Sequence, residues 1–172
     1  NLNIIGVDIK GNRMYIGAKK ALDNQLTNAA FLRTQIEKIN DYFSPGEVSG
    51  MWITFPDPQL RTSKAKKRLT HPRFLRLYQQ MLVPGSPVHL KTDSPQLYRF
   101  TKKVIELYGL NFVEDSDDVY AQQMVNDDLK IKTHYESLDI AQSKKIHYLQ
   151  FILPSVLPDI DEQLKEMIAH DE

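Results

Sequence analysis

The chain has 172 residues, 41% hydrophobic and 26% charged, and these proportions predict one globular domain over residues 1–172. It contains no cysteine, which excludes disulfides, thiolate metal sites and a cysteine nucleophile. The sequence shows neither an apolar run of about 18 residues nor a basic-then-apolar leader, so we expect a cytoplasmic protein that does not enter a membrane.

The formal net charge is zero, but the charges are segregated along the sequence. The stretch from residue 61 to residue 91 contains no Asp or Glu, whereas acids gather within 114–128 and 159–172. The cations of the basic stretch are Arg61, Lys64, Lys66, Lys67, Arg68, Arg73, Arg76 and Lys91. A neutral total therefore hides a local field that can attract phosphate, although such a run can also be a solvated helix face.

Short apolar runs alternate with helical patterns in the first part of the chain. We expect strands over 3–9, 29–32 and 50–55, and helices that end at about residue 22 and span 36–43. Pro56 ends the third strand, because proline cannot donate a hydrogen bond to a sheet ladder.

The same alternation continues in the second part. Thr70-His71-Pro72 predicts the start of a helix, and Pro84-Gly85 marks its end. The further expected elements are strands over 87–93 and 145–153 and helices over 94–108 and 159–170.

This order of elements predicts a doubly wound α/β fold, with a mostly parallel sheet and helices on both faces. Such sheets bind ligands at the carboxyl ends of their strands. Three expected strands end near an acid, namely Asp8, Asp57 and Asp93. We expect these carboxylates to mark the functional edge of the sheet.

Four sequence segments, joined by a basic linker over 64–67, carry a resemblance to a known family. They are Phe55-Pro56-Asp57-Pro58, Arg68-Leu69-Thr70-His71-Pro72-Arg73-Phe74-Leu75, His89-Leu90-Lys91-Thr92-Asp93 and Thr133-His134-Tyr135-Glu136. Their order and spacing resemble the bacterial tRNA (guanine-46-N7)-methyltransferases. The resemblance implies a Rossmann-like class I methyltransferase fold, S-adenosylmethionine as cofactor, tRNA as partner and substrate, no metal, and a monomer or homodimer.

The sequence departs from the family pattern at two places. The family's first strand, with its Gly-rich turn, is expected before Asn1 and is absent from this chain. Gln59-Leu60-Arg61 stands where a tryptophan and a lysine commonly follow the Phe-Pro-Asp-Pro segment.

Two residues are expected to bind the cofactor near its nucleoside. Asp8 follows the first strand, where nucleotide-binding α/β proteins place an acid on the ribose hydroxyls. An equally good interpretation is that Asp8 caps the helix that follows it. The resemblance places Gln35 at the adenine-side position, where the family has an acid.

Asp57 is the expected catalytic residue. Guanine N7 has an exposed lone pair, so its methylation requires alignment and tolerance of a cationic purine rather than deprotonation. A carboxylate can hold the Watson–Crick edge of the base and favour the developing charge. Because Asp57 is expected to lie beside the methyl group of the cofactor, we also expect it to bind the cofactor. The alternative is that Asp57 is only a turn aspartate.

The remaining expected contacts are with tRNA. The resemblance implies guanine or tRNA contacts at Asp93, Thr133, His134, Tyr135 and Glu136, which without it would be a helix-preceding acid and a polar loop. The expected phosphate contacts are Arg61, Lys64, Lys66, Lys67 and Arg68. We expect structural roles for His71 and His89, because this chemistry needs no general base.

Two other functions stay open from the residues alone. One is a methyltransferase for another substrate, which the basic linker after Asp57 disfavours. The other is a non-catalytic RNA-binding module of the same fold, which the absent Gly-rich strand and Gln35 favour.

Overall fold

The computed structural model describes residues 2–121, 127–133, 136 and 145–169. Contacts between residues group the chain into two compact units, Asn1–Ser44 and Pro45–Glu172. None of the helices in the described ranges has the length and apolar character needed to cross a membrane.

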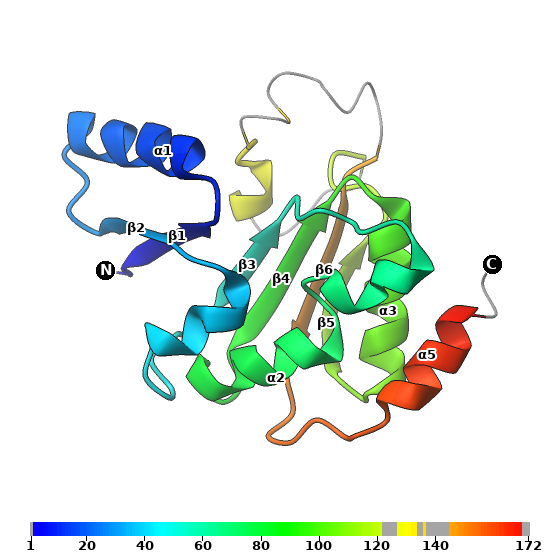
Figure 1. Cartoon of the computed structure of the whole chain (residues 1–172). Coiled ribbons are helices and arrows are strands. Elements are labelled where there is room, and N and C mark those ends of the chain that lie inside the picture. Colours follow the sequence, from blue (N-terminus) through cyan, green and yellow to red (C-terminus); the bar gives the residue numbers. More distant parts are fainter. Residues whose placement is uncertain (1, 122–126, 134–135, 137–144, 170–172) are drawn as a thin grey trace. The chain divides into compact units, whose positions relative to one another are not determined.

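The first unit is a strand–helix–strand arrangement (Figure 1). Strand β1 (Ile4–Asp8) pairs in parallel with β2 (Ala29–Arg33), and helix α1 (Gly11–Asp23) connects them. A Cβ atom on Gly17 would lie only 2.6 Å from the ring of Phe31, so glycine permits α1 to pack this closely on β2. A short 3₁₀ helix, η1 (Ile36–Asp41), follows.

The second unit contains a four-stranded sheet with the order β3-β4-β6-β5 (Figure 1). Its strands are β3 (Met51–Thr54), β4 (Pro87–Thr92), β5 (Asn111–Ser116) and β6 (His147–Ile152). Strands β3 and β4 are parallel, whereas β6 runs antiparallel to both β4 and β5. The sheet of this unit is therefore mixed, which refines the expectation of mostly parallel pairing.

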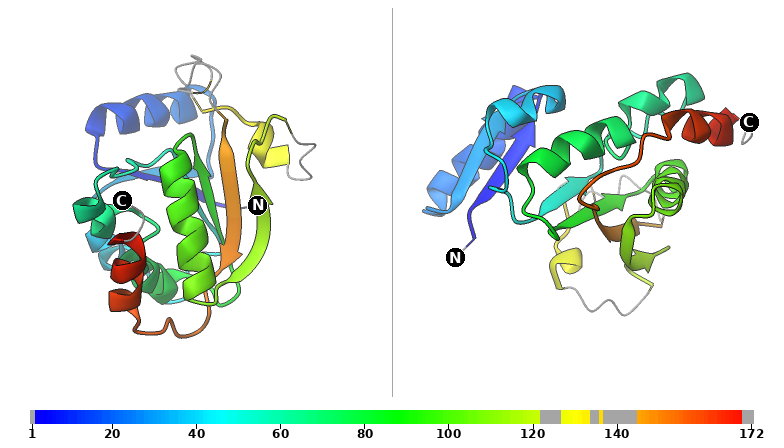
Figure 2. Two further views of the ribbon diagram at one scale, coloured as in Figure 1. Left: turned by 90° about the vertical axis from the view of Figure 1, so that its right-hand side faces the viewer. Right: turned by 90° about the horizontal axis from the view of Figure 1, so that it is seen from below.

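Helices and 3₁₀ turns connect these strands. They are η2 (Thr62–Lys67), α2 (Pro72–Met81), α3 (Pro95–Leu107), η3 (Asp127–Lys130) and α5 (Asp161–Ala169). His71 caps α2 and Ser94 caps α3, each by accepting a hydrogen bond from a backbone N–H of the first turn. Helix α3 packs along β4 and β6 (Figure 2).

Strand β4 lies at the centre of the core and is buried on both faces. Side chains alternate along a strand, so Leu90 faces one side of the sheet and Lys91 the other. Tyr148 lies directly opposite Lys91 on β6 and packs with Val119 and Leu129.

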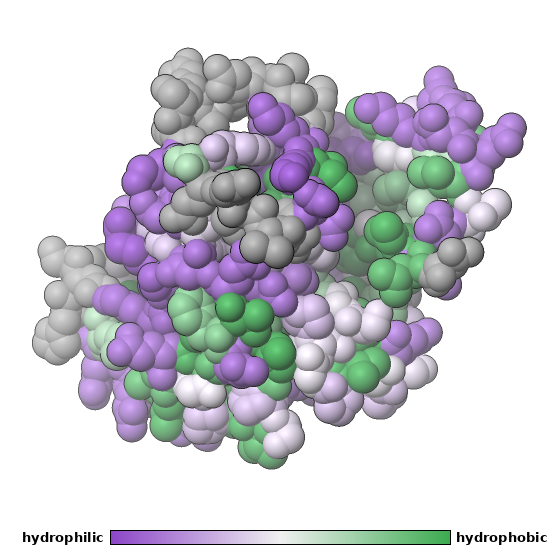
Figure 3. Space-filling view, turned by 180° about the vertical axis from the view of Figure 1, so that it is seen from behind, coloured by the Kyte–Doolittle hydropathy of each residue, from purple (hydrophilic) through white to green (hydrophobic). Residues whose placement is uncertain are grey.

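Some large apolar side chains remain exposed in each unit. Ile4, Ile5 and Val7 of β1 and Trp52 of β3 are examples. Figure 3 shows apolar patches between hydrophilic ones on one face of the molecule.

Candidate active site

Most of the expected functional groups of the second unit lie along one edge of the four-stranded sheet, namely the edge at which the carboxyl ends of its parallel strands meet. Strands β3, β4 and β5 end at this edge and β6 begins there, as their pairing requires. Asp57 follows the end of β3 and Asp93 follows the end of β4. The parallel pairing of β3 and β4 thus supports the expectation that both carboxylates lie at one edge.

Asp57 lies in a tightly held loop. Phe55 and Gln59 on either side of it both have a φ of 47°, in the left-handed region that costs a non-glycine residue about 1–3 kcal/mol. The Asp57 carboxylate accepts a hydrogen bond from Gln59 N at 3.0 Å, and its side chain remains exposed. The loop therefore presents a carboxylate to solvent in a fixed backbone conformation.

Arg68 stabilises the same loop through hydrogen bonds to its backbone carbonyl oxygens. Only 6% of this residue is exposed, and its guanidinium donates to the carbonyl oxygens of Pro58 at 3.2 Å and Gln59 at 3.1 Å. It also lies 4.5 Å from the ring centre of Phe100, and burial lowers its pKa. Arg68 therefore uses its Nε and Nη2 donors inside the protein, and its expected phosphate contact stays a prediction.

The other four expected phosphate contacts are exposed cations in or next to η2: Arg61, Lys64, Lys66 and Lys67. Among the described residues, none of them has an ion-pair partner. Ala65 is the buried residue that fixes η2 to the unit. The four cations are therefore available to an external anion.

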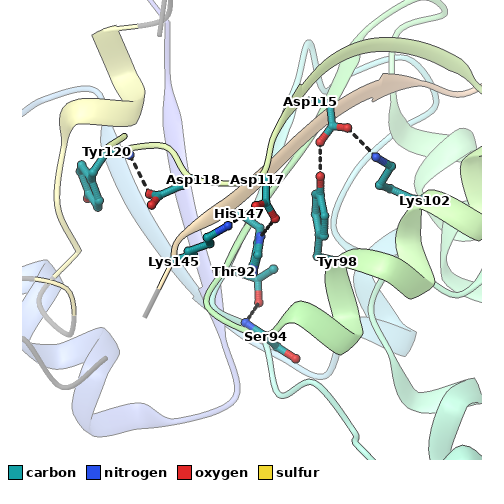
Figure 4. Close-up of polar contacts among 10 residues, drawn as sticks. All are labelled: Thr92, Ser94, Tyr98, Lys102, Asp115, Asp117, Asp118, Tyr120, Lys145 and His147. Atoms are coloured by element: carbon teal, nitrogen blue, oxygen red, sulfur yellow. Dashed lines mark hydrogen bonds and ion pairs between the residues drawn. The ribbon is translucent and has the colours of Figure 1, made fainter. Parts of the chain in front are cut away.

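Asp93 lies between two residues that shape the start of α3. The Thr92 hydroxyl accepts a hydrogen bond from Ser94 N at 3.1 Å, and the Ser94 hydroxyl accepts one from Leu97 N at 3.2 Å (Figure 4). The Asp93 side chain is half-buried and has no hydrogen-bond or ion-pair partner within the described ranges.

The acids at the end of β5 are paired with protein groups (Figure 4). Asp115 accepts hydrogen bonds from Tyr98 and from Lys102, the latter at 2.6 Å. Asp117 forms an ion pair with Lys145 and lies 3.2 Å from His147, and the hydrogen bond from Lys145 lowers its pKa. These acids therefore add less negative field to the edge than the sequence alone indicates.

No local pattern in the sequence predicts that Asp117, Lys145 and His147 form a group. They meet because β5 and β6 pair beside each other, whereas they are far apart in the sequence. The adjacent apolar residues Phe112 and Val113 are the only strand-like signal within 111–116, and the two acids that follow them weaken it.

Glu136 forms a buried ion pair with Lys91. Their charged atoms lie 2.9 Å apart, and each side chain is 3% exposed. Lys91 also donates to the carbonyl oxygens of Leu129 and Ile131, at 3.1 and 3.2 Å. This pair therefore fastens the segment after η3 to the centre of the sheet.

Thr133 and Glu136 bond reciprocally, in the pattern of a helix capping box. Thr133 N donates to the Glu136 carboxylate at 2.7 Å, and Glu136 N donates to the Thr133 hydroxyl at 3.3 Å. Burial alone would raise the pKa of Glu136, but hydrogen bonds, first that from Tyr120, lower it. The expected contacts His134 and Tyr135 lie outside the described residues.

His71 and His89 are both structural, as expected. The Nδ1 atom of His71 caps α2, and that of His89 lies 2.8 Å from the Tyr148 hydroxyl. Burial lowers the pKa of each imidazole to about 4. Both rings are therefore neutral at physiological pH and bonded within the fold.

The first unit carries the two residues expected to bind the cofactor. Asp8 ends β1, and its Oδ1 accepts a hydrogen bond from Lys10 N at 2.9 Å. The other carboxylate oxygen of Asp8 lies 4.0 Å from Nη1 of Arg13, and about a third of the Asp8 side chain is exposed. Gln35 is exposed immediately before η1.

Residues 1–149 match the family described as "Putative methyltransferase". The chain belongs to this family. The resemblance to methyltransferases inferred from the four sequence segments is therefore confirmed.

Two relatives carry a more specific description. The tRNA (guanine-N(7)-)-methyltransferase of Porphyromonas gingivalis is 49% identical over 150 residues, which cover 87% of this chain and 61% of the relative. The protein of the same description from Bacteroides fragilis is 44% identical over 166 residues, covering 94% and 65%. The chain thus spans a little under two thirds of the length of these relatives.

A solved structure supports the fold independently. The crystal structure of a SAM dependent methyltransferase from Aquifex aeolicus has a TM-score of 0.57 at 10% identity, covering 88% of this chain and 69% of that chain. A likeness at this identity concerns the fold alone. It confirms the expected Rossmann-like α/β class.

Proposed function

We propose that the protein containing this chain transfers a methyl group from S-adenosylmethionine to N7 of guanine 46 in tRNA. The observation that carries this proposal is the placement of Asp57, an exposed carboxylate at the strand edge whose loop leads directly into a helix of unpaired cations. The descriptions of the two relatives agree with this chemistry.

The residues of the first unit fit the nucleoside part of the cofactor. Asp8 keeps one carboxylate oxygen able to accept from ribose hydroxyls, and Gln35 exposes an amide for the adenine. When bound, S-adenosylmethionine supplies a methyl group activated by a sulfonium.

Asp57 has two roles in this proposal. It accepts hydrogen bonds from the Watson–Crick edge of the guanine, which orients N7, and its negative charge favours the purine as that ring becomes cationic. The rigid backbone of its loop keeps the carboxylate in place before the substrate arrives. Asp93, the half-buried acid at the same edge, is proposed as a second contact of the base.

The exposed cations of η2 are proposed to bind the tRNA backbone. Phosphate contacts of this kind position a nucleic acid without reading its sequence. Thr133 and Glu136 act in this scheme by holding their segment in place, and the protein acts in the cytoplasm as a monomer or homodimer.

Incubation with labelled S-adenosylmethionine and unmodified tRNA should give 7-methylguanosine in the variable loop. Nuclease digestion and chromatography of the nucleosides identify the labelled atom. A tRNA transcript with adenosine at position 46 is the matched control and should take up no label.

Other outcomes would select the other functions. Label in a small molecule, in protein or on another RNA atom would indicate a methyltransferase for another substrate. Binding of tRNA without any methyl transfer would indicate a non-catalytic RNA-binding module.

Replacing Lys64, Lys66 and Lys67 together by alanine should weaken tRNA binding and flatten its salt dependence. Each lost phosphate contact lowers the slope of log K against log salt by about 0.7–0.9. Fluorescence titrations between low and physiological salt measure this slope. The exposed lysines of the first unit, Lys19, Lys20 and Lys38, provide a triple-alanine control with the same change of charge. An unchanged slope in the η2 variant would show that its lysines only solvate the surface.

A further inference from the structure

The loop that carries Asp57 continues into a segment whose two ends are joined by one side chain. Arg68 directly follows the last residue of η2, and its guanidinium returns to the beginning of the segment. There it donates hydrogen bonds to the carbonyl oxygens of Pro58 at 3.2 Å and Gln59 at 3.1 Å. Residues 58–68 therefore form a closed loop that includes η2.

Arg68 itself is fixed by the core of the second unit. Its guanidinium carbon lies 4.5 Å from the ring centre of Phe100 on α3, a residue of which only 4% is exposed. Its backbone N–H donates to Ala65 O at 3.0 Å, and its carbonyl oxygen accepts from His71 N at 2.9 Å. The side chain and the backbone of Arg68 thus join the closed loop to η2, to the start of α2 and to α3.

The backbone on either side of Asp57 needs support from the rest of the fold. Phe55 and Gln59 both have a φ of 47°, and non-glycine residues stay in this region only where the surrounding structure determines their conformation. The N–H of Gln59 donates to Asp57 Oδ1 at 3.0 Å, whereas its carbonyl oxygen accepts from Arg68. One residue therefore links the exposed carboxylate directly to the buried guanidinium.

These contacts depend on the shape of the guanidinium as well as on its charge. Its donors have fixed directions, so Nε and Nη2 reach neighbouring carbonyl oxygens while the central carbon lies over an aromatic ring. A lysine ammonium carries the same charge but bonds as a single point.

We propose that Arg68 is a positioning residue for the reaction. It holds the Asp57 carboxylate and the exposed cations of η2 in one rigid loop, so that RNA bound along η2 presents its guanine to Asp57. This inference rests on the proposed function, because it takes Asp57 as the catalytic carboxylate and η2 as the phosphate contact.

Arg68→Ala and Arg68→Lys test the proposal in the natural protein. The single-turnover rate at saturating tRNA should fall by about 10²-fold in the alanine variant, because a small displacement of a catalytic group has an effect of this size. Lysine keeps the charge but should restore little of the rate. The salt slope of tRNA binding should stay at the wild-type value, because the exposed cations of η2 remain.

Free guanidinium ion separates positioning from general stability. Arg68 lines an open cavity of about 400 Å³, so the ion can reach the space that alanine leaves. Guanidinium chloride far below denaturing concentrations should raise the rate of Arg68→Ala, whereas equal concentrations of methylammonium chloride or sodium chloride should not.

Arg76→Ala is the matched control. The Arg76 guanidinium is paired with Asp161 of α5 at 2.8 Å and has no bond to the Asp57 loop among the described residues. Its loss should lower the melting temperature, leave the rate of methylation unchanged and give no response to guanidinium ion.

Hydrogen exchange tests the closed loop without any methyl transfer. The Gln59 N–H, which is bonded to Asp57, should exchange faster in Arg68→Ala and more slowly again when guanidinium ion is added. Faster exchange in a protein that does not methylate tRNA would support the hold of Arg68 on Asp57 and contradict only the proposed enzyme.

Two results would overturn the proposal. The first is wild-type exchange of the Gln59 N–H in folded Arg68→Ala. The second is a near wild-type rate at saturating tRNA together with a salt slope lowered by about 0.7–0.9, which would make Arg68 a phosphate contact. Circular dichroism shows which variants are folded, and Arg68→Lys carries both measurements if the alanine variant does not fold.

Discussion

Replacing Asp57 by asparagine should lower the single-turnover rate of tRNA methylation by about 10²–10³, the usual loss for one preorganised electrostatic partner. Asparagine has the same shape and can keep the hydrogen bond from Gln59 N, so the loop should retain its conformation. It lacks the charge that offsets a cationic purine. The change therefore isolates the electrostatic role.

The same preparation can show whether the cofactor still binds. Calorimetry with S-adenosylhomocysteine should give a nearly normal affinity, because the ribose is assigned to Asp8. Asp23→Asn, at an exposed aspartate of α1, is the control and should change neither quantity. A near wild-type rate in the Asp57 variant would make Asp57 a turn residue, and an equal loss of cofactor affinity would make its role cofactor-directed or structural.

Replacing Glu136 by glutamine should lower the free energy of unfolding by about 3–5 kcal/mol, because it leaves the buried Lys91 ammonium without its counter-ion. Chemical denaturation at neutral pH measures this difference. The control is Glu162→Gln, which breaks the exposed pair with Lys165 and should cost less than about 1 kcal/mol.

The loss in the Glu136 variant should also depend on pH. The pKa of Glu136 is lowered in the folded protein, so its stabilising contribution is complete above the unfolded value of 4.5 and disappears as pH falls through the folded value. The difference between wild type and variant should therefore shrink in acid. An unchanged stability combined with lost tRNA methylation would instead make Glu136 a substrate contact.

Much of the fold follows from local patterns in the sequence. The expected strand over 87–93 is β4 (Pro87–Thr92), and the expected helix over 94–108 is α3 (Pro95–Leu107). Both elements have strong signals, because β4 is a buried run and Ser94-Pro95 starts the helix.

Strand β5 was missed for a physical reason. Phe112 and Val113 are about half exposed, and Glu114 and Asp115 follow them at the edge of the sheet. An edge strand with one solvated face needs few apolar residues, so its sequence resembles an acidic loop. The antiparallel direction of β6 also depends on long-range pairing that no local pattern encodes.

The sequence located the candidate residues of the second unit better than their roles. Asp57 was expected at a strand end and lies beyond β3, whereas Arg68 and Glu136 are buried and bound to groups of the fold, and their expected contacts with tRNA stay a prediction. Burial decides between these roles, and a charged residue in a basic or polar segment carries no local signal of its burial.

Under the proposed function, the pairing of the β5 acids changes how this chain, whose formal net charge is zero, approaches a polyanion. A molecule without net charge feels little overall pull from distant RNA, but separated charges experience a torque in its field. Lys102 and Lys145 neutralise Asp115 and Asp117, which would otherwise repel the RNA. The cations of η2 have no such partners among the described residues. The encounter should therefore begin with rotation of the protein into the correct orientation, and capture should follow within about 10 Å, because salt largely screens exposed charges beyond that distance.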